Sequence, residues 1–322
     1  MSADYWDGRV SLYHSGRWPD VTPERRLPGG PAGGPALVLD SPFWNGYQRD
    51  AGTPAVWDGP MAYLPSLYSV YGPTHLTAPA EIARTLEEAA GRARAHATAG
   101  LLVANLPRSC ARRWRAVREP DAVIRLDVAY SCDVRDGVDG VLAALPRDER
   151  VEWRRRWRRA RERGLTMTRD AGRLPEALRL ANDSAVRHGI EPLYDAATFA
   201  AVAALPGAAV VCADLGGATL AAFLTVEHDG VLHLWAGGID YAALRAYSPY
   251  LFLLYEILAG APARGVRRVE FGRGSYAFKR RYGFTGTELW SLYYAPGPEA
   301  AAAHAPRLAV MHERLAAFMG LR

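Results

Sequence analysis

The chain of 322 residues is 49% hydrophobic and carries 39 basic against 34 acidic side chains, a formal net charge of +5. Its length suits two domains of ~150 residues, each with enough apolar surface for its own core. No run of about 18 apolar residues occurs, and residues 1–7 lack the cationic start and apolar stretch of a signal peptide. These features argue against a membrane span, and we expect a soluble, cytoplasmic protein.

Three cysteines, Cys110, Cys132 and Cys212, lie far apart without CxxC or histidine-coupled spacing. This spacing argues against a disulfide framework and against a metal site. The basic excess is arginine rather than lysine, with several arginines in one short segment, which is typical of a polyanionic partner. An arginine-rich composition that reflects a GC-rich genome would look the same.

In the first half, the Gly- and Pro-rich stretch Leu27–Pro35 predicts a surface loop. Apolar residues at near 3.6 spacing predict a helix over 80–99, and short apolar or alternating runs predict strands over 36–39, 101–106 and 122–129. Helices over 139–144 and 148–162 follow, with Gly164 as the terminator of the second. The first domain is expected to end between the last strand and these helices.

In the second half, helix and strand patterns alternate, and Asp229-Gly230 predicts a hairpin between two strands. The expected helices cover 174–188, 250–259 and 297–322. The expected strands cover 208–214, 220–227, 231–236, 266–271 and 287–294. This order predicts a mixed α/β domain around a central sheet.

Two segments carry a family resemblance: Glu152–Thr166, EWRRRWRRARERGLT, and Val266–Phe284, VRRVEFGRGSYAFKRRYGF. They resemble the FemAB-like and BioF2-like acyltransferases of the GNAT superfamily. In those families a basic helix ending in glycine opens the second domain, and a strand leads through an FG-type turn to an aromatic-Lys-x-x-aromatic-Gly sequence, matched here by residues 278–283. The resemblance implies an α/β fold of two GNAT-like domains, each a mixed central sheet flanked by helices. We expect residues 1–145 to form the first domain and 146–322 the second, which carries the active site.

The resemblance also implies roles for side chains near Lys279. An ammonium aimed at the oxyanion that forms during acyl transfer can contribute about 3 kcal/mol, and Lys279 is the predicted donor; the alternative is one more surface cation beside Arg280 and Arg281. Lys279 and His233 are the predicted catalytic residues. The predicted substrate-binding residues are Phe278, Trp235, Arg273 and Tyr282. His233 and Trp235 alternate on one strand and should share a sheet face.

A general base is required only if the attacking amine arrives protonated, and the candidates are His233, Glu227, Asp240 and Glu270. The basic helix should pack inward through Val151, Trp157 and Ala160, because a helix so charged cannot be buried all round. Its arginines suit the phosphates of a tRNA acceptor stem, although a solvated helix face explains them equally well. The predicted tRNA-binding residues are Arg154, Arg155, Arg158, Arg159, Arg280 and Arg281.

The Q/R-x-x-G-x-G/A run with which GNAT proteins usually hold the pyrophosphate of coenzyme A is not present in clean form. Characterised FemAB-like proteins often take the acyl group from aminoacyl-tRNA. The resemblance therefore implies transfer of an aminoacyl group to the amine of a small molecule, in natural-product or antibiotic biosynthesis rather than the cell wall, with no metal and no tightly bound cofactor. The alternatives are an acyl-CoA-dependent N-acyltransferase and a non-catalytic RNA-binding module.

Overall fold

The computed structural model describes residues 5–16, 18, 37–39, 42–57, 59–64 and 68–321. The chain forms two compact units: unit 1 consists of Met1–Ala129 and Gly286–Arg322, and unit 2 of Tyr130–Thr285. These units differ from the expected division at 145/146, because the C-terminal residues belong with the first part of the chain. That both units are GNAT-like domains stays a prediction.

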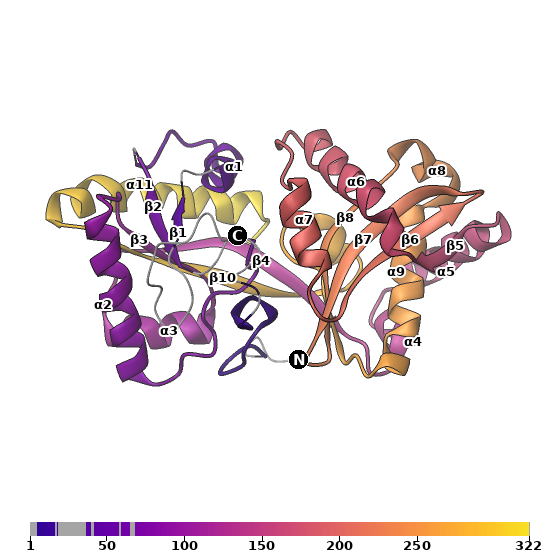
Figure 1. Ribbon diagram of the computed structural model, residues 1–322, viewed down its shortest axis with the longest axis horizontal. Coiled ribbons are helices and arrows are strands. Elements are labelled where there is room, and N and C mark those ends of the chain that lie inside the picture. The colour runs from indigo at the N-terminus through magenta and orange to yellow at the C-terminus, as the bar shows by residue number, and fades with distance from the viewer. Residues whose placement is uncertain are drawn as a thin grey trace. The chain divides into compact units, whose positions relative to one another are not determined.

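Unit 1 is a sheet covered by helices, and its core lies between α2, α3 and the strands (Figure 1). Strand β1 pairs antiparallel with β2, β2 parallel with β3, and β3 antiparallel with β10. Helix α2 buries residues at the predicted helical spacing, among them Ile82, Leu86 and Ala89. The elements of unit 1 are β1 (Leu37–Leu39), α1 (Pro42–Ala51), β2 (Met61–Leu64), α2 (Pro79–Ala95), β3 (Leu101–Pro107), α3 (Arg108–Val117), the first part of β4 (Ala122–Asp133), β10 (Thr285–Tyr294) and α11 (Pro298–Phe318).

Unit 2 is a second mixed α/β arrangement. Strands β5 to β8 pair antiparallel in chain order, β8 pairs parallel with β9, and β9 pairs antiparallel with the end of β4. Its further elements are α4 (Gly137–Ala143), α5 (Arg147–Glu162), β5 (Thr166–Arg169), α6 (Leu174–Arg187), α7 (Ala196–Ala203), β6 (Ala208–Leu215), β7 (Ala218–His228), β8 (Val231–Ile239), α8 (Leu244–Tyr247), α9 (Pro249–Gly260), β9 (Arg268–Glu270) and α10 (Tyr276–Arg281).

Two glycines at the end of β8 let helices approach both faces of the unit 2 sheet. A Cβ on Gly238 would lie 1.9 Å from the carbonyl oxygen of Leu180 in α6. A Cβ on Gly237 would lie 2.3 Å from the ring of Phe223, which contacts Tyr250 of α9. Since successive residues of a strand point to opposite faces, α6 and α9 cover opposite faces of the sheet.

The two units repeat one order of elements. In unit 1, β2-α2-β3 is a parallel pair with a crossover helix, followed by α3 and β4. In unit 2, β8-α9-β9 is again a parallel pair with a crossover helix, followed by α10 and β10. The strand that follows each series belongs to the other part of the chain: the end of β4 lies in unit 2 and pairs there with β9, and β10 lies in unit 1 and pairs there with β3.

Most predicted elements are present within a few residues of their expected bounds, including the hairpin at Asp229-Gly230 and the helix end at Gly164, whose φ is +85°. The short elements α1, β2, α3, β5, α7, α8 and α10 were not predicted, because their length gives too little periodicity. The predicted loop Leu27–Pro35 lies outside the described residues. Among the described residues, no helix is long and apolar enough to cross a membrane.

Candidate active site

The turn between β9 and α10 is the centre of the candidate site. Gly272 and Gly274 have φ values of +63° and +74°, and Ser275 has +48°. Glycine adopts this left-handed region without steric cost, which explains both glycines of the Gly272-Arg273-Gly274 sequence. The turn reverses the chain directly after β9 and leads it into α10, which carries Phe278 and Lys279.

Lys279 is only 4% exposed, so the alternative that it is a surface cation is wrong. Its Nζ donates to the carbonyl oxygens of Phe271 at 2.8 Å, Gly272 at 3.1 Å and Arg273 at 2.8 Å. It also lies 5.7 Å from the centre of the Tyr130 ring. Because an ammonium has three N–H donors, these carbonyls can take all of them.

A row of aromatic side chains extends from this turn towards α5. Phe278 contacts Tyr250 and Tyr282 at ring-centre distances of 5.3 and 4.6 Å. Tyr282 contacts Trp153 at 4.9 Å, and burial raises the pKa of Tyr282. Phe278 and Tyr250 are half-buried, so the row has a face that a ligand could contact, whereas Tyr282 is buried at 5% exposure.

Trp235 lies at a β-bulge in β8. Thr225 pairs with Leu234 and Leu224 with Ala236, so Trp235 is an extra residue in β8. Its ring lies 4.8 Å from Tyr194 and 5.8 Å from Phe199 of α7. Trp235 is half-buried and could contact a ligand from this aromatic group.

His233 lies on β8 opposite Glu270 of β9, and the pairing puts its side chain on the α6 face. It is 1% exposed, and burial lowers its pKa to about 3, with smaller contributions from His228 and then Arg268. A neutral imidazole of such low basicity, away from solvent, is a poor general base at neutral pH.

The three carboxylates that were candidate bases all have partners. Glu270 accepts from Arg268 Nε at 2.8 Å, and both residues are buried. Glu227 accepts from Arg264 at 3.4 Å, and Asp240 accepts from the backbone N–H of Ala242 at 2.9 Å. The structure therefore singles out none of them as a base.

Helix α5 packs through its tryptophans. Trp153 donates to the carbonyl of Leu251 at 3.0 Å, and Trp157 stacks on Tyr255 at 4.3 Å. The prediction that Val151 packs inward is wrong, since Val151 is 56% exposed and Trp153 is the buried residue of that turn. Tryptophan in so basic a segment signalled this face, because its large apolar surface favours burial.

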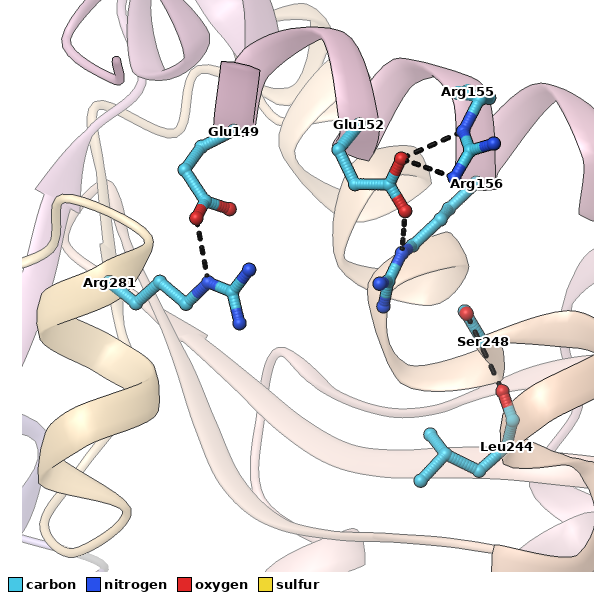
Figure 2. A network of polar contacts seen from close by, with 7 residues as sticks. All are labelled: Glu149, Glu152, Arg155, Arg156, Leu244, Ser248 and Arg281. Carbon is cyan, nitrogen blue, oxygen red and sulfur yellow. Dashed lines mark hydrogen bonds and ion pairs between the residues drawn. The ribbon is translucent and has the colours of Figure 1, made fainter. Parts of the chain in front are cut away.

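Acidic residues neutralise the first half of α5 (Figure 2). Glu152 pairs with Arg155 and Arg156, both at 2.6 Å, and the bond from Arg156 lowers the pKa of Glu152. Arg154 pairs with Asp139 at 2.7 Å. Three of the seven arginines between 154 and 163 are thus held in ion pairs.

The second half of α5 is different. Arg158 and Arg159 are exposed, and within the part of the chain that the structure describes neither is in an ion pair. Arg163 follows the helix and donates to the carbonyl of Ala246 in α8 at 2.6 Å. The cationic surface available to a polyanion is therefore this second half.

The arginines around α10 differ among themselves. Arg281 pairs with Glu149 of α5 at 2.9 Å, and this bond raises the pKa of Arg281 (Figure 2). Arg280 is exposed and donates to the hydroxyl of Tyr130 at 3.4 Å, and Arg273 is half-buried in the turn. The prediction overlooked Tyr130, because its position depends on pairing with residues more than 140 positions later.

No group of three or more His, Cys, Asp or Glu side chains that could hold a metal ion occurs in the described ranges. The three cysteines are free and buried, and burial raises the pKa of each thiol, for Cys110 to about 11. Thiolate chemistry is therefore disfavoured at neutral pH.

Comparisons with known proteins identify a domain within unit 2. Residues 147–280, from α5 to α10, match the model of the acetyltransferase (GNAT) domain. Among solved structures, FemX has a TM-score of 0.59 at 12% identity, covering 90% of this chain and 96% of FemX. No curated protein sequence matches the chain.

Two further structures have TM-scores of 0.51. The C-terminal domain of a putative lysylphosphatidylglycerol synthetase from Agrobacterium fabrum is 13% identical, and the match covers 76% of this chain and 80% of that domain. L-PGS from Bacillus licheniformis is 12% identical, with 73% and 78% covered. Identities this low establish the fold. The domain match shows that residues 147–280 are an acyltransferase domain of the GNAT type, and the solved structures show that the chain has the fold of FemX.

Proposed function

We propose that the protein transfers an aminoacyl group from aminoacyl-tRNA to the amine of a small-molecule acceptor. The observation that carries this proposal is the exposed cationic half of α5, because Arg158 and Arg159 suit a chain of phosphates. The name of the lysylphosphatidylglycerol synthetase, which shares the fold, indicates a lysyl group as cargo and supports an aminoacyl donor.

The start of α9 supports this donor over acyl-CoA. Helix α9 is separated from β8 by the short helix α8, and a pyrophosphate at the start of α9 would be held by backbone N–H groups. Pro249 has no N–H and occupies the first helical position, and Ser248 before it adopts a φ of +45°. This start therefore offers one amide donor fewer than a glycine-rich loop.

The chemistry is attack of the acceptor amine on the ester carbonyl of the charged tRNA. A C–N bond forms, the C–O bond to the ribose breaks, the amine loses a proton and the ribose oxygen gains one. Phe278, Trp235, Arg273 and Tyr282 remain the proposed substrate-binding residues, although Tyr282 would act mainly by supporting Phe278.

A small-molecule acceptor, in natural-product assembly, is proposed over a cell-wall precursor. Cell-wall FemAB proteins often carry a pair of long helices inserted in the second domain. The longest helix of unit 2 is α5, with 16 residues, so nothing in Tyr130–Thr285 corresponds to such an arm.

The test is incubation of the purified protein with a pool of radiolabelled aminoacyl-tRNAs and, separately, with acyl-CoAs, measuring transfer to added amines or loss of the donor. Selective consumption of one charged tRNA supports the proposal and names the donor. Turnover of a CoA thioester alone would establish the acyl-CoA-dependent alternative. Binding of tRNA without turnover of any donor would favour an RNA-binding module.

A further inference from the structure

The ammonium of Lys279 is committed to the protein's own backbone. It lies within 3.1 Å of three successive carbonyl oxygens, of Phe271, Gly272 and Arg273, and the residue is 4% exposed. A lysine that donates to a reacting oxygen needs an N–H directed at the ligand. In this arrangement the three N–H groups are directed at the turn.

Backbone hydrogen bonds connect the turn to β4, and one of them uses a carbonyl that Lys279 also binds. Gly272 accepts a second hydrogen bond, from the backbone N–H of Tyr130 at 3.0 Å, and the carbonyl of Tyr130 accepts from Phe271 at 2.8 Å. Lys279 therefore joins α10, the end of β9 and β4 through one buried charge.

The turn needs such a restraint. Three of its four residues between 272 and 275 have positive φ, including Ser275, for which this region is unfavourable. A backbone with these positive φ values persists only where contacts with the surrounding structure hold it in place. The turn carries two side chains, the exposed Ser275 and the half-buried Arg273, and Arg273 is a proposed substrate-binding residue.

We propose that Lys279 is a positioning residue: it fixes the turn after β9 and thereby places Arg273, and it does not itself donate to the reacting oxygen. The inference rests on the proposed function only in taking Arg273 as a substrate contact. Lys279→Gln, which keeps two donors but loses the charge, frees at least one carbonyl and loosens the turn.

The first test needs no substrate. Hydrogen exchange of the Tyr130 and Phe271 amides is compared between the wild type and Lys279→Gln, with Arg281→Gln as the control on the same helix. We expect at least tenfold faster exchange of both amides in Lys279→Gln and no change in the control. Unchanged exchange in Lys279→Gln would overturn the proposal. If that variant does not fold, Lys279→Arg, which keeps the charge in another shape, is measured on the same two amides.

The second test is a double-mutant cycle on kcat/KM, using charged tRNA or acetyl-CoA, whichever the protein consumes. If Lys279 acts by placing Arg273, then Lys279→Gln should hardly lower kcat/KM once Arg273→Ala has removed the arginine side chain. The kcat/KM of the double variant then stays within about threefold of that of the poorer single variant. Losses that multiply would mean independent roles and refute the proposal. Turnover of acetyl-CoA alone would refute the tRNA donor but leave this cycle measurable.

Discussion

The sharpest prediction compares two pairs of arginines on α5. Arg158→Ala/Arg159→Ala removes the exposed pair, and Arg154→Ala/Arg155→Ala removes two arginines held by Asp139 and Glu152. Both double variants change the net charge by the same amount. A difference between them therefore reports direct phosphate contacts rather than the overall field of the protein.

The magnitude follows from counterion release. Each phosphate contact contributes about 0.9 to the slope of log affinity against log salt, so losing two contacts lowers the slope by ~1.8. Extrapolated from 1 M salt, where such contacts contribute little, this corresponds to a loss of ~30-fold in tRNA affinity at 0.15 M. The ion-paired arginines must first leave their carboxylates, so their removal should change the slope by less than half as much.

The assay is fluorescence anisotropy of labelled, uncharged tRNA between 50 and 300 mM KCl, a range over which the slope is measurable. Equal slope changes in the two variants would refute the assignment of the contacts to the second half of α5. A larger effect of Arg154→Ala/Arg155→Ala would move the contact surface to the first half.

Three further outcomes are expected. Glu270→Gln leaves the buried guanidinium of Arg268 without its counter-charge and should lower the free energy of unfolding by about 3–5 kcal/mol, measured by urea denaturation. Burial lowers the pKa of His233 in the folded protein to about 3, below its ordinary value of 6.5, so folding favours its neutral form. The free energy of unfolding of the wild type, relative to His233→Gln and measured by urea denaturation, should be constant above pH 6.5 and fall progressively from pH 6.5 towards 3. A relative stability of the wild type that rises as the pH falls would contradict this. Gly238→Ala places a methyl group 1.9 Å from the Leu180 carbonyl and should lower the melting temperature by several degrees in a thermal scan, an effect absent if α6 can move freely.

Much of the fold follows from local patterns. The helical spacing of Ile82, Leu86 and Ala89 and the Asp229-Gly230 hairpin are readable because each depends on residues close in sequence. The bulge at Trp235 has no such local signal, since it exists only through pairing with Leu224 and Thr225 on the neighbouring strand. The predicted division of the chain differs from the compact units for the same reason, because the partner of β10 is β3.

The sequence located the turn beside Lys279 but not the orientations of the side chains around it. The glycines after β9 predicted a sharp turn near Lys279, and the turn is there. Whether a lysine in a six-residue helix points inward depends on what packs against the helix, and here the decisive neighbours are backbone carbonyls. The arginines of α5 look alike in the sequence, but Glu152 and Asp139 distinguish them, and these pairings depend on rotamers and on a second helix, α4.

The interruption of unit 1 in the sequence has a consequence for synthesis on the ribosome. Unit 2 is one continuous stretch, Tyr130–Thr285, so all of its residues emerge in succession. Unit 1 is interrupted, since Leu101 of β3 pairs with Tyr294 of β10, which is made 193 residues later (294 − 101). At ~5–20 residues per second, this interval leaves one edge of β3 unpaired for roughly 10–40 s. The nascent chain therefore carries an exposed strand edge while the whole of unit 2 is being made, and a chaperone has most to protect in this interval.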